Sequence, residues 1–306
     1  MSEPVTRGLG RLTMRQMLLL ATIDDSASLK GAATRIGMSQ PRATKSLQEI
    51  EDMVEQQLFT RTNRGLTPTI AGACAIRHAK VMLSQIGSLE EELRHIAEGA
   101  WAKLRIGTIM GATPIVTEAI GTFSERFPNV SLEILEDTSV ELLRLLDRGD
   151  LDLMIGRSSV SGRPELYDTV AFHDELLTVV ANPAHPLVER KRVTLAELSQ
   201  SRWIVYTAMM PMRISLEQEY REAGLAFPRT LVETRSAFAT MSLLHSSPNY
   251  IALLSSDVAA FFVDLGAART LNFRLRSKSQ AYEVITRRKT PLPPAAAEFI
   301  RALTMR

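Results

Sequence analysis

Cysteine is almost absent from this 306-residue chain, and Cys74 is its one thiol. A single thiol excludes an internal disulfide and a zinc site built from several thiolates. No apolar run reaches the roughly 20 residues that a membrane-spanning helix needs, so no membrane partner is expected. The opening residues MSEPVTRGLGRLTMRQ lack an apolar core beside a basic start, which predicts no secretory signal and a bacterial-type cytoplasmic location.

Sequence signatures of catalysis are missing as well. There is no G-x-S-x-G, no P-loop, and no cluster of His, Cys and Asp at metal-ligand spacing. The five histidines are scattered over the later chain, at His78, His95, His173, His185 and His245. We therefore expect no enzyme activity, no metal and no other cofactor.

A large charge of one sign is also lacking. The net charge is +2, and the chain is 45% hydrophobic and 23% charged, which suits a soluble globular protein of two or three domains. Overall charge therefore does not indicate nucleic-acid binding. A small DNA-binding head on a larger, nearly neutral sensor would have this balance.

Residues 28–54 have the pattern of two helices joined by a tight turn. Ser28 is a good N-cap, and Gly37 is expected to end the first helix because glycine enters the left-handed region without steric cost. Ser39 is the next N-cap, and Pro41 stands in the first turn, where its missing N–H is not needed. This order is typical of a helix-turn-helix, whose second helix enters the DNA major groove.

The second helix of the pair has one apolar and one polar side. Its apolar residues are spaced to face inward, at Leu47, Ile50, Met53 and Val54. The start of the helix carries polar and basic groups that reach base edges and phosphates. We take these as candidate DNA-binding residues: Ser39, Gln40, Pro41, Arg42, Thr44 and Lys45.

A short basic hairpin is predicted after the second helix. Two extended runs, Gln57 to Arg61 and Leu66 to Pro68, flank a turn with Asn and Gly. Arg61 and Arg64 project from it and complete the candidate DNA-binding set. This hairpin has the form of a wing that lies on the phosphate backbone or in a minor groove.

The helix pair and its basic residues could also be purely structural features that do not bind DNA. Two helices joined by a glycine turn also occur in proteins that never bind DNA, and basic side chains are often only solvated. Acidic residues follow closely, at Glu49, Glu51, Asp52 and Glu55. These acids lie later in the helix, however, whereas the cations gather at its tip and on the wing, which favours DNA binding.

A long helix is predicted after the wing. Thr69 is its expected cap, no proline interrupts it before Glu98, and it would run about 45 Å. Apolar residues recur at steps of three and four, at Ala79, Met82, Ile86, Leu89, Leu93 and Ile96. This heptad seam favours a two-stranded dimer contact over packing on its own domain.

Cys74 is expected to serve packing rather than redox chemistry. Thr13 is expected to start an earlier helix that packs across the back of the helix-turn-helix.

From Lys103 the pattern changes to alternating strands and helices. The expected strands are 104–107, 130–136, 151–156, 176–180, 203–206, 230–233 and 251–254, and the expected helices are 114–127, 140–148, 211–223 and 237–245. This alternation predicts a parallel sheet with right-handed crossovers.

The tail of the chain is basic, with Arg274, Arg276, Lys278, Arg287, Arg288 and Lys289. It is expected to be a solvated strand edge rather than a second DNA-facing patch.

The chain resembles the LysR-type transcriptional regulators over nearly its whole length. In the head the matching residues are Ala32-Ala33, Ser39-Gln40-Pro41, Thr44-Lys45, Gln57-Leu58-Phe59-x-Arg61 and Arg64-Gly65-x-x-x-Thr69-x-Ala71-Gly72. Later they are Phe127-Pro128-x-Val130, Gly149-x-Leu151-Asp152-Leu153-x-Ile155-Gly156 and His185-Pro186-Leu187. One departure concerns the two positions after Pro41, where the family usually has small or aliphatic residues and this chain has Arg42 and Ala43.

The resemblance implies a multidomain fold. It consists of an all-α winged helix-turn-helix domain at 1–68, a dimerisation linker helix at 69–98, and a two-lobed α/β effector domain of type 2 periplasmic-binding-protein-like fold at 103–306. The first lobe would be 103–159 with 272–302, and the second 160–271. The hinge segments would lie near Arg157–Gly162 and Gly266–Phe273.

Four loops of the effector domain are candidates for ligand binding, because ligands bind beyond the carboxyl ends of the strands in such sheets. By the resemblance, the same loops line the effector cleft. The candidate effector-binding residues are Thr108, Met110, Thr113, Ser139, Thr207, Met210, Arg213 and Ser236. Arg213 stands at a helix start and is expected to pair with a carboxylate. Met110, Met209, Met210 and Met212 suggest an adaptable apolar wall, suited to an aromatic or other hydrophobic acid.

The favoured function is a LysR-type DNA-binding transcriptional regulator whose promoter binding is modulated by a small-molecule effector between the two lobes. Its expected partners are double-stranded promoter DNA, a small organic effector such as an acid, itself as a homodimer or homotetramer, and RNA polymerase. The alternative is a cytoplasmic small-molecule receptor of periplasmic-binding-protein type, which leaves the head unexplained. A third reading, an enzyme, has no supporting motif.

Overall fold

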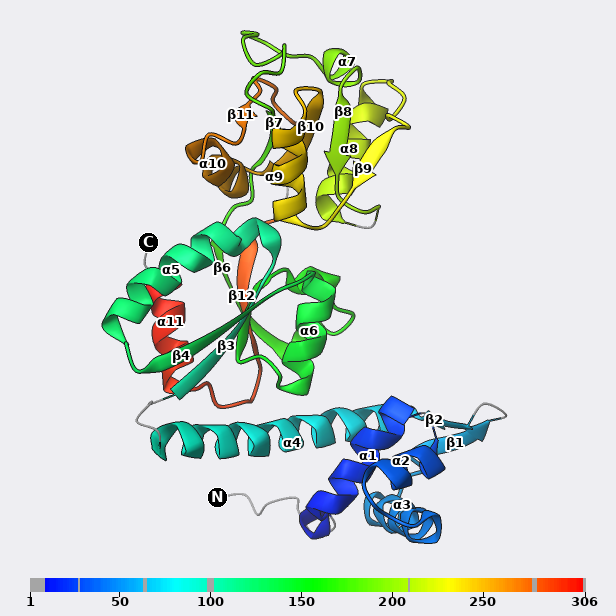
Figure 1. Ribbon diagram of the computed structural model, residues 1–306. Helices are drawn as coiled ribbons and strands as arrows, with labels where there is room; N and C mark the ends of the chain where they lie inside the picture. The colour runs from blue at the N-terminus through cyan, green and yellow to red at the C-terminus, as the bar shows by residue number, and fades with distance from the viewer. Residues whose placement is uncertain are drawn as a thin grey trace. The chain divides into compact units, whose positions relative to one another are not determined.

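A computed structural model describes residues 9–26, 28–62, 65–97, 102–208, 210–276 and 280–304. These residues form two units, each described by itself: one holds a helical head with its long helix and also residues 144–151, and the other holds the rest of an α/β body. The head is drawn in blue to cyan and the body in green to red (Figure 1). The predicted residues Arg64, Met209 and Lys278 lie outside the described ranges.

The head contains four α-helices and a two-stranded hairpin within the described residues. Their bounds are α1 Met14–Ser26, α2 Leu29–Arg35, α3 Gln40–Val54, β1 Phe59–Thr62, β2 Gly65–Pro68 and α4 Ile70–Ala97. One apolar core holds these elements together, and Leu19, Ala32, Ile50 and Leu58 are at most 2% exposed in it. The predicted helix-turn-helix, hairpin and long helix are therefore present.

An ion-pair cluster joins the first helix to the long one. Lys80 of α4 donates to Asp24 Oδ2 at 2.5 Å and to Asp25 Oδ1 at 2.9 Å, both near the end of α1. The hydrogen bond from Lys80 lowers the pKa of Asp25 below its ordinary value. The start of α4 therefore belongs to the head, because it packs on α1 as well as following the hairpin.

The α/β body contains two five-stranded sheets. Its elements are β3 Ala102–Thr108, α5 Thr113–Arg126, β4 Val130–Glu136, α6 Ser139–Arg148, β5 Leu153–Gly156, β6 Tyr167–His173, β7 Leu177–Ala181, α7 Leu195–Leu198, β8 Arg202–Val205, α8 Pro211–Glu222, β9 Leu231–Glu233, α9 Ala237–Ser246, β10 Tyr250–Ser255, α10 Ser256–Asp264, β11 Arg269–Thr270, β12 Tyr282–Arg287 and α11 Pro294–Thr304. Every predicted strand and helix of this region is found, with ends that agree to within two residues.

Both sheets are mixed, so the prediction of a parallel sheet is wrong in part. The first sheet has the order β4-β3-β5-β12-β6, in which β3 and β5 are parallel and β12 is antiparallel to both of its neighbours. The second has the order β11-β7-β10-β8-β9, in which β7 is antiparallel to β10 and β11. Antiparallel pairing arises because the chain passes twice between the lobes and returns as β12.

The expected position of the first crossing between the lobes also needs correction. Strand β6 belongs to the first sheet, so the first crossing follows His173 at residues 174–176 and does not lie at Arg157–Gly162. β11 ends at Thr270 in the second sheet and β12 begins at Tyr282 in the first, so the second crossing follows Thr270. The basic tail is not a strand edge either, because β12, which ends at Arg287, pairs with β5 on one side and β6 on the other.

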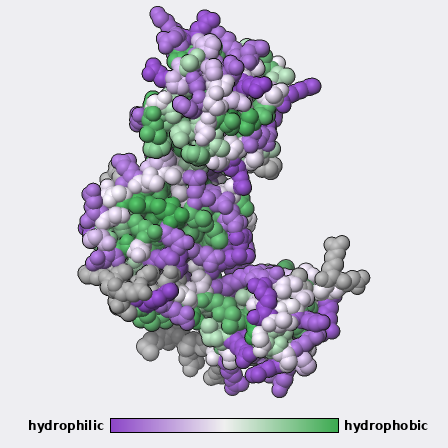
Figure 2. Space-filling view, in the orientation of Figure 1, coloured by the Kyte–Doolittle hydropathy of each residue, from purple (hydrophilic) through white to green (hydrophobic). Residues whose placement is uncertain are grey.

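An edge strand of the body carries exposed apolar groups. β4 stands at one end of the first sheet, and its Ile134 and Leu135 are 43% and 40% exposed. Figure 2 shows a hydrophobic area, in green, over this sheet, with hydrophilic residues around it. The body therefore presents an apolar surface that its own described residues do not cover.

Candidate nucleic-acid interface and effector cavity

The turn between α2 and α3 forms as the sequence predicts. The Ser28 hydroxyl accepts the Gly31 N–H at 3.1 Å and caps α2. Gly37 has φ +61°, a left-handed conformation that carries a steric cost for any residue with a Cβ atom. Met38 then donates its N–H to Ala33 O at 2.8 Å and closes the turn. These contacts set the position from which α3 starts.

The buried side of α3 determines which of its residues face solvent. Ala43 and Ile50 are fully buried against the head core, and Leu47 is 8% exposed. The predicted contact residues of this helix are all exposed, namely Ser39, Gln40, Pro41, Arg42, Thr44 and Lys45. Among their charges, Lys45 Nζ lies 4.0 Å from Glu49 Oε1, one turn further along the helix. The helix tip is therefore a polar, accessible surface with two cations.

An acid of α3 holds the wing. Glu51 Oε1 accepts the Leu58 N–H at 2.7 Å and the Phe59 N–H at 3.2 Å, at the start of β1. The neighbouring acid therefore has a structural role and does not oppose DNA binding at the helix tip. Arg61 is exposed on β1, and Arg64 lies outside the described residues.

A tight junction connects the wing to α4. Thr69 Oγ1 donates to Gln57 O at 2.8 Å and accepts the Gly72 N–H at 3.0 Å, so it caps α4 as predicted. A Cβ atom at Gly72 would lie 1.9 Å from Leu58 O, which only glycine avoids. Cys74 is exposed at this end of α4, so the expectation that it serves packing is wrong.

The heptad seam of α4 changes character along the helix. Ala79 is buried in the head core, whereas Met82, Ile86, Leu89 and Leu93 are 47%, 36%, 53% and 58% exposed. The side chain of Ile96 lies outside the described residues. Four apolar residues at heptad spacing are thus left in solvent by the described part of the chain, which is the pattern of a helix that pairs with another.

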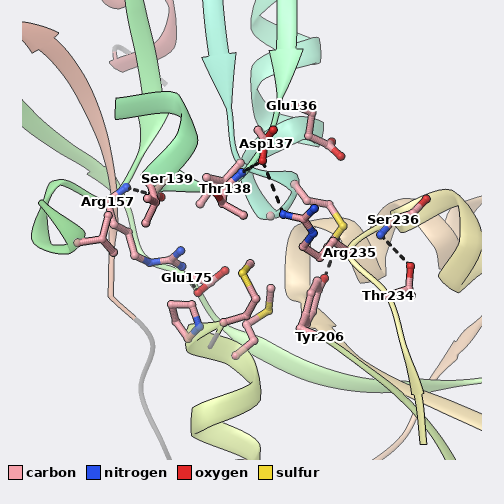
Figure 3. A pocket seen from close by; sticks show the side chains of 18 residues that line it. Glu136, Asp137, Thr138, Ser139, Arg157, Glu175, Tyr206, Thr234, Arg235 and Ser236 are labelled. Atoms are coloured by element: carbon pink, nitrogen blue, oxygen red, sulfur yellow. Dashed lines mark hydrogen bonds and ion pairs between the residues drawn. The ribbon is translucent and has the colours of Figure 1, made fainter. Parts of the chain in front are cut away.

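A cavity of about 490 Å³ lies in the α/β body, where loops of the two sheets meet. Figure 3 shows side chains from both sheets pointing into it. Its lining consists of Ile109, Met110, Gly111, Glu136, Asp137, Thr138, Ser139, Val140, Arg157, Val160, Glu175, Tyr206, Met210, Pro211, Met212, Thr234, Arg235 and Ser236. The volume suits a small organic molecule.

The cavity contains half of the predicted effector residues. Met110, Ser139, Met210 and Ser236 line it, whereas Thr108, Thr113, Thr207 and Arg213 do not. Thr108 is fully buried below the rim, and Thr113 donates to Glu136 Oε2 at 2.7 Å from the side.

Arg213 needs a specific correction. Its Nε donates to Glu217 Oε1 at 2.6 Å, its Nη1 to Glu233 Oε1 at 3.4 Å, and its guanidinium lies 4.5 Å from the centroid of the Phe227 ring. The first residues of a helix point in several directions, and this one turns toward the acids of its own lobe. Arg213 is thus committed within the second lobe, and its expected role as a carboxylate partner is not supported.

The floor of the cavity is a buried ion pair that sequence reasoning missed. Arg157 follows β5 and pairs with Glu175 of the first crossing segment, whose side chain is 0% exposed. The hydroxyl of Tyr282 donates to Glu175 Oε1 at 2.8 Å, and the Arg157 guanidinium lies 5.5 Å from the Tyr282 ring centroid. Burial, and then the Glu175 charge, raise the pKa of Tyr282, so its hydroxyl stays protonated. The cluster ties the first crossing segment to β12 and to the end of β5 in the first sheet.

Tyr206 connects the lobes at the cavity wall. It follows β8 in the second sheet, is 5% exposed, and donates its hydroxyl to the Met110 sulfur at 3.6 Å. Burial raises the pKa of Tyr206 strongly, so the phenol is a neutral donor. A thioether is a weak acceptor. A ligand oxygen would therefore be a better partner than Met110.

The charges around the cavity do not favour an acid. Its acids are Glu136, Asp137 and Glu175, and its cations are Arg157, which is paired with Glu175, and Arg235. Arg235 Nη1 lies 3.9 Å from Asp137 Oδ1, at the rim labelled in Figure 3. Arg235 is 61% exposed, and so it is the cation that a ligand would meet first.

Neither a metal centre nor a membrane helix occurs in the described ranges. Within them, no three His, Cys, Asp or Glu side chains are grouped so that they could bind a metal ion. No helix there combines the length and apolar character needed to span a membrane.

Two family models match the chain. Residues 14–73 match the model described as bacterial regulatory helix-turn-helix protein, lysR family. Residues 97–306 match the LysR substrate binding domain. The matched regions contain the exposed tip of α3 and the cavity, respectively.

Several relatives match over most of the chain, among them two transcriptional regulators. The transcriptional regulator GbpR of Azospirillum brasilense is 28% identical over 295 residues, covering 96% of this chain and 86% of that protein. The transcriptional regulator GalR of Pseudomonas putida is 25% identical over 297 residues, covering 94% and 72%.

Solved structures have the same fold. A full-length OxyR variant from Pseudomonas aeruginosa has a TM-score of 0.62 at 19% identity, covering 96% of this chain and 95% of that one. CbnR in complex with its target DNA has a TM-score of 0.60 at 19% identity, covering 95% and 99%.

Proposed function

We propose that promoter DNA is contacted by the exposed tip of α3 and by the wing. The chain belongs to the LysR family of DNA-binding transcriptional regulators, which have an effector-binding domain. The contact residues are Ser39, Gln40, Pro41, Arg42, Thr44, Lys45, Arg61 and Arg64. The observation that carries this proposal is the uniform exposure of the α3 set opposite a buried apolar side. We also propose a DNA-binding domain at 1–68, a dimerisation linker helix at 69–98 and a two-lobed effector domain at 103–306, in which the first crossing between the lobes lies at 174–176.

The DNA test compares matched variants. Gln40→Ala removes a predicted base-edge contact, and Arg229→Ala removes an exposed cation from the α/β body as a control. In gel shifts with the DNA upstream of its own gene at moderate salt, Gln40→Ala should bind about 5-fold to 100-fold more weakly, and the control should match the wild type. No specific shift by the wild type would overturn the proposal.

The effector is proposed to bind in the cavity. Met110, Met210 and Met212 supply its apolar wall, Ser139 and Ser236 supply hydroxyls, and Tyr206, Thr234 and Arg235 join them from the second lobe. A bound molecule would touch both sheets at once and would thereby favour one arrangement of the lobes over others. Such a shift changes how the paired heads meet DNA.

A thermal-shift screen tests this binding site. Small organic acids and neutral sugars are both included, because the lining charges do not favour an acid. Any compound that stabilises the wild type should bind Tyr206→Phe about 10-fold more weakly, since one hydrogen bond is lost while the ring remains. Equal binding by both proteins for every stabilising compound would place the effector elsewhere.

Self-association is proposed through two apolar surfaces. The exposed seam of α4 would pair two copies, and the apolar edge strand β4 offers a second surface. One surface alone gives a homodimer, and the use of both gives a homotetramer. Sedimentation of the full chain distinguishes these states, and a monomer at micromolar concentration would contradict the proposal.

A further inference from the structure

Arg42 is an exposed cation at the tip of α3, the helix proposed to contact DNA. It is exposed in the first turn of α3, next to the fully buried Ala43. Its guanidinium has no ion pair or hydrogen bond with any described residue. The residues three and four positions onward are Lys45 and Ser46, so no acid stands within reach on its helix. The five N–H donors of Arg42 are therefore uncommitted.

The helix geometry places Arg42 at the side of the exposed face of α3. Residues of an α-helix are spaced about 100° apart, and buried Ala43 and Ile50 define the inward direction of α3. Pro41 and Lys45 then point straight outward, and Arg42 flanks them. In a helix-turn-helix the first residues of the second helix approach base edges, whereas later residues move away from the groove.

A phosphate role at this end of α3 is already supplied by other groups. The Ser39 side chain makes no capping hydrogen bond, so the backbone N–H groups of the first turn remain available for a phosphate oxygen. Lys45 and the wing residue Arg61 offer further cations on exposed positions. A guanidinium, by contrast, can donate two parallel hydrogen bonds, which match the paired O6 and N7 acceptors of guanine. A contact to one phosphate oxygen does not need this geometry.

We infer that Arg42 reads a guanine in the major groove through two parallel hydrogen bonds to O6 and N7. This inference rests on the proposed function of α3 as the DNA-contacting helix. It makes Arg42 a specificity-determining residue, and it predicts one guanine at the same place in each half-site.

The test begins with selection of binding sites from random-sequence DNA by four full-length proteins. These are the wild type, Arg42→Ala, Arg42→Lys and the control Arg229→Ala, each checked for an unchanged melting temperature. The wild type and the control should select one guanine per half-site that Arg42→Ala no longer prefers, with all other positions retained. Arg42→Lys should keep a weakened preference, because an ammonium donates to guanine with less geometric control.

A second measurement addresses the guanine atoms themselves. Replacing that guanine by 7-deazaguanine removes N7 and should weaken wild-type binding by about 10-fold, but should leave Arg42→Ala unaffected. The inference is overturned if all four proteins select the same sequence and Arg42→Ala merely binds every DNA more weakly with a shallower salt dependence, since that describes a phosphate contact. Failure of the wild type to select any sequence would instead overturn the proposed function itself, and the inference with it.

Discussion

The head and the α/β body hold their candidate functional residues in opposite environments. On α3 the contact set is exposed and the apolar side alone is buried, so function and stability are assigned to different residues. In the cavity, Arg157, Glu175 and Tyr206 are buried and take part in the packing that holds the lobes. A substitution in the exposed contact set of α3 should therefore change DNA binding without unfolding the head, whereas one at the cavity floor should change both ligand binding and stability.

The largest effect is expected at Glu175. Glu175→Ala removes the carboxylate that pairs with the buried Arg157 and that accepts the Tyr282 hydroxyl. Breaking a buried pair in this way costs about 3–5 kcal/mol. Urea unfolding followed by circular dichroism should show that loss in the α/β body, with Glu175→Gln retaining part of the stability. A loss below about 1 kcal/mol would contradict the claim that the Arg157–Glu175 pair holds the lobes together.

Next in size is the seam of α4. Leu89→Glu places a carboxylate where two helices would pair, and should weaken association by about 100-fold or more, because a charge is desolvated at the contact. Arg94→Glu, on the same helix outside the seam, is the control. Sedimentation equilibrium reports both, and an unchanged oligomer for Leu89→Glu would place self-association on another surface.

A smaller effect is expected at the cap of α2. Ser28→Ala removes the acceptor of the Gly31 N–H and should lower the unfolding free energy of the head by about 1 kcal/mol. Thermal melting of the full chain measures it, and Ser28→Asp, which keeps an acceptor, should recover most of the loss. If Ser28→Asp melts as early as Ser28→Ala, the cap is not the cause.

The smallest effect concerns pH. His185 is buried, which lowers its pKa below 6.5, and its Nδ1 accepts the Leu187 N–H at 3.1 Å. The unfolded chain then takes up this proton more readily than the folded one, so the stability that neutral His185 contributes is complete above about pH 6.5 and declines as the pH falls below it. Unfolding at about pH 7.5 and about pH 5.5 should show a smaller decline for His185→Asn than for the wild type. Equal declines would contradict this assignment.

The same contrast explains what the sequence can predict. The head is predictable nearly residue by residue, because a cap at Ser28, a glycine turn at Gly37 and helical apolar spacing are local signals. Most strands and helices of the body up to β10 are also predictable, with β6 as an exception. The exposed position of Cys74 is not, since a small apolar residue near a helix start looks like a packing residue.

Other features depend on contacts between distant segments. β6 carries the sequence YDTVAFH, in which four consecutive residues after the first are exposed, so it lacks the alternation that marks a strand. β12 has a charged end and is recognisable only through its pairing with β5 and β6. Arg157 and Glu175 are 18 residues apart and meet only in the folded lobe. Arg213 is misassigned from sequence because its acids come from the next helical turn and from β9.

The most direct test of the central claim is a fluorescence-anisotropy titration of Lys45→Glu with the DNA upstream of its own gene. Lys45 is exposed, so the variant should melt at the wild-type temperature yet bind this DNA roughly 10-fold or more weakly, because a cation facing the phosphates becomes an anion. Arg229→Glu, with the same change of charge on the α/β body, should bind like the wild type. Equal affinity of Lys45→Glu and the wild type would contradict the assignment of α3 as the DNA-contacting helix.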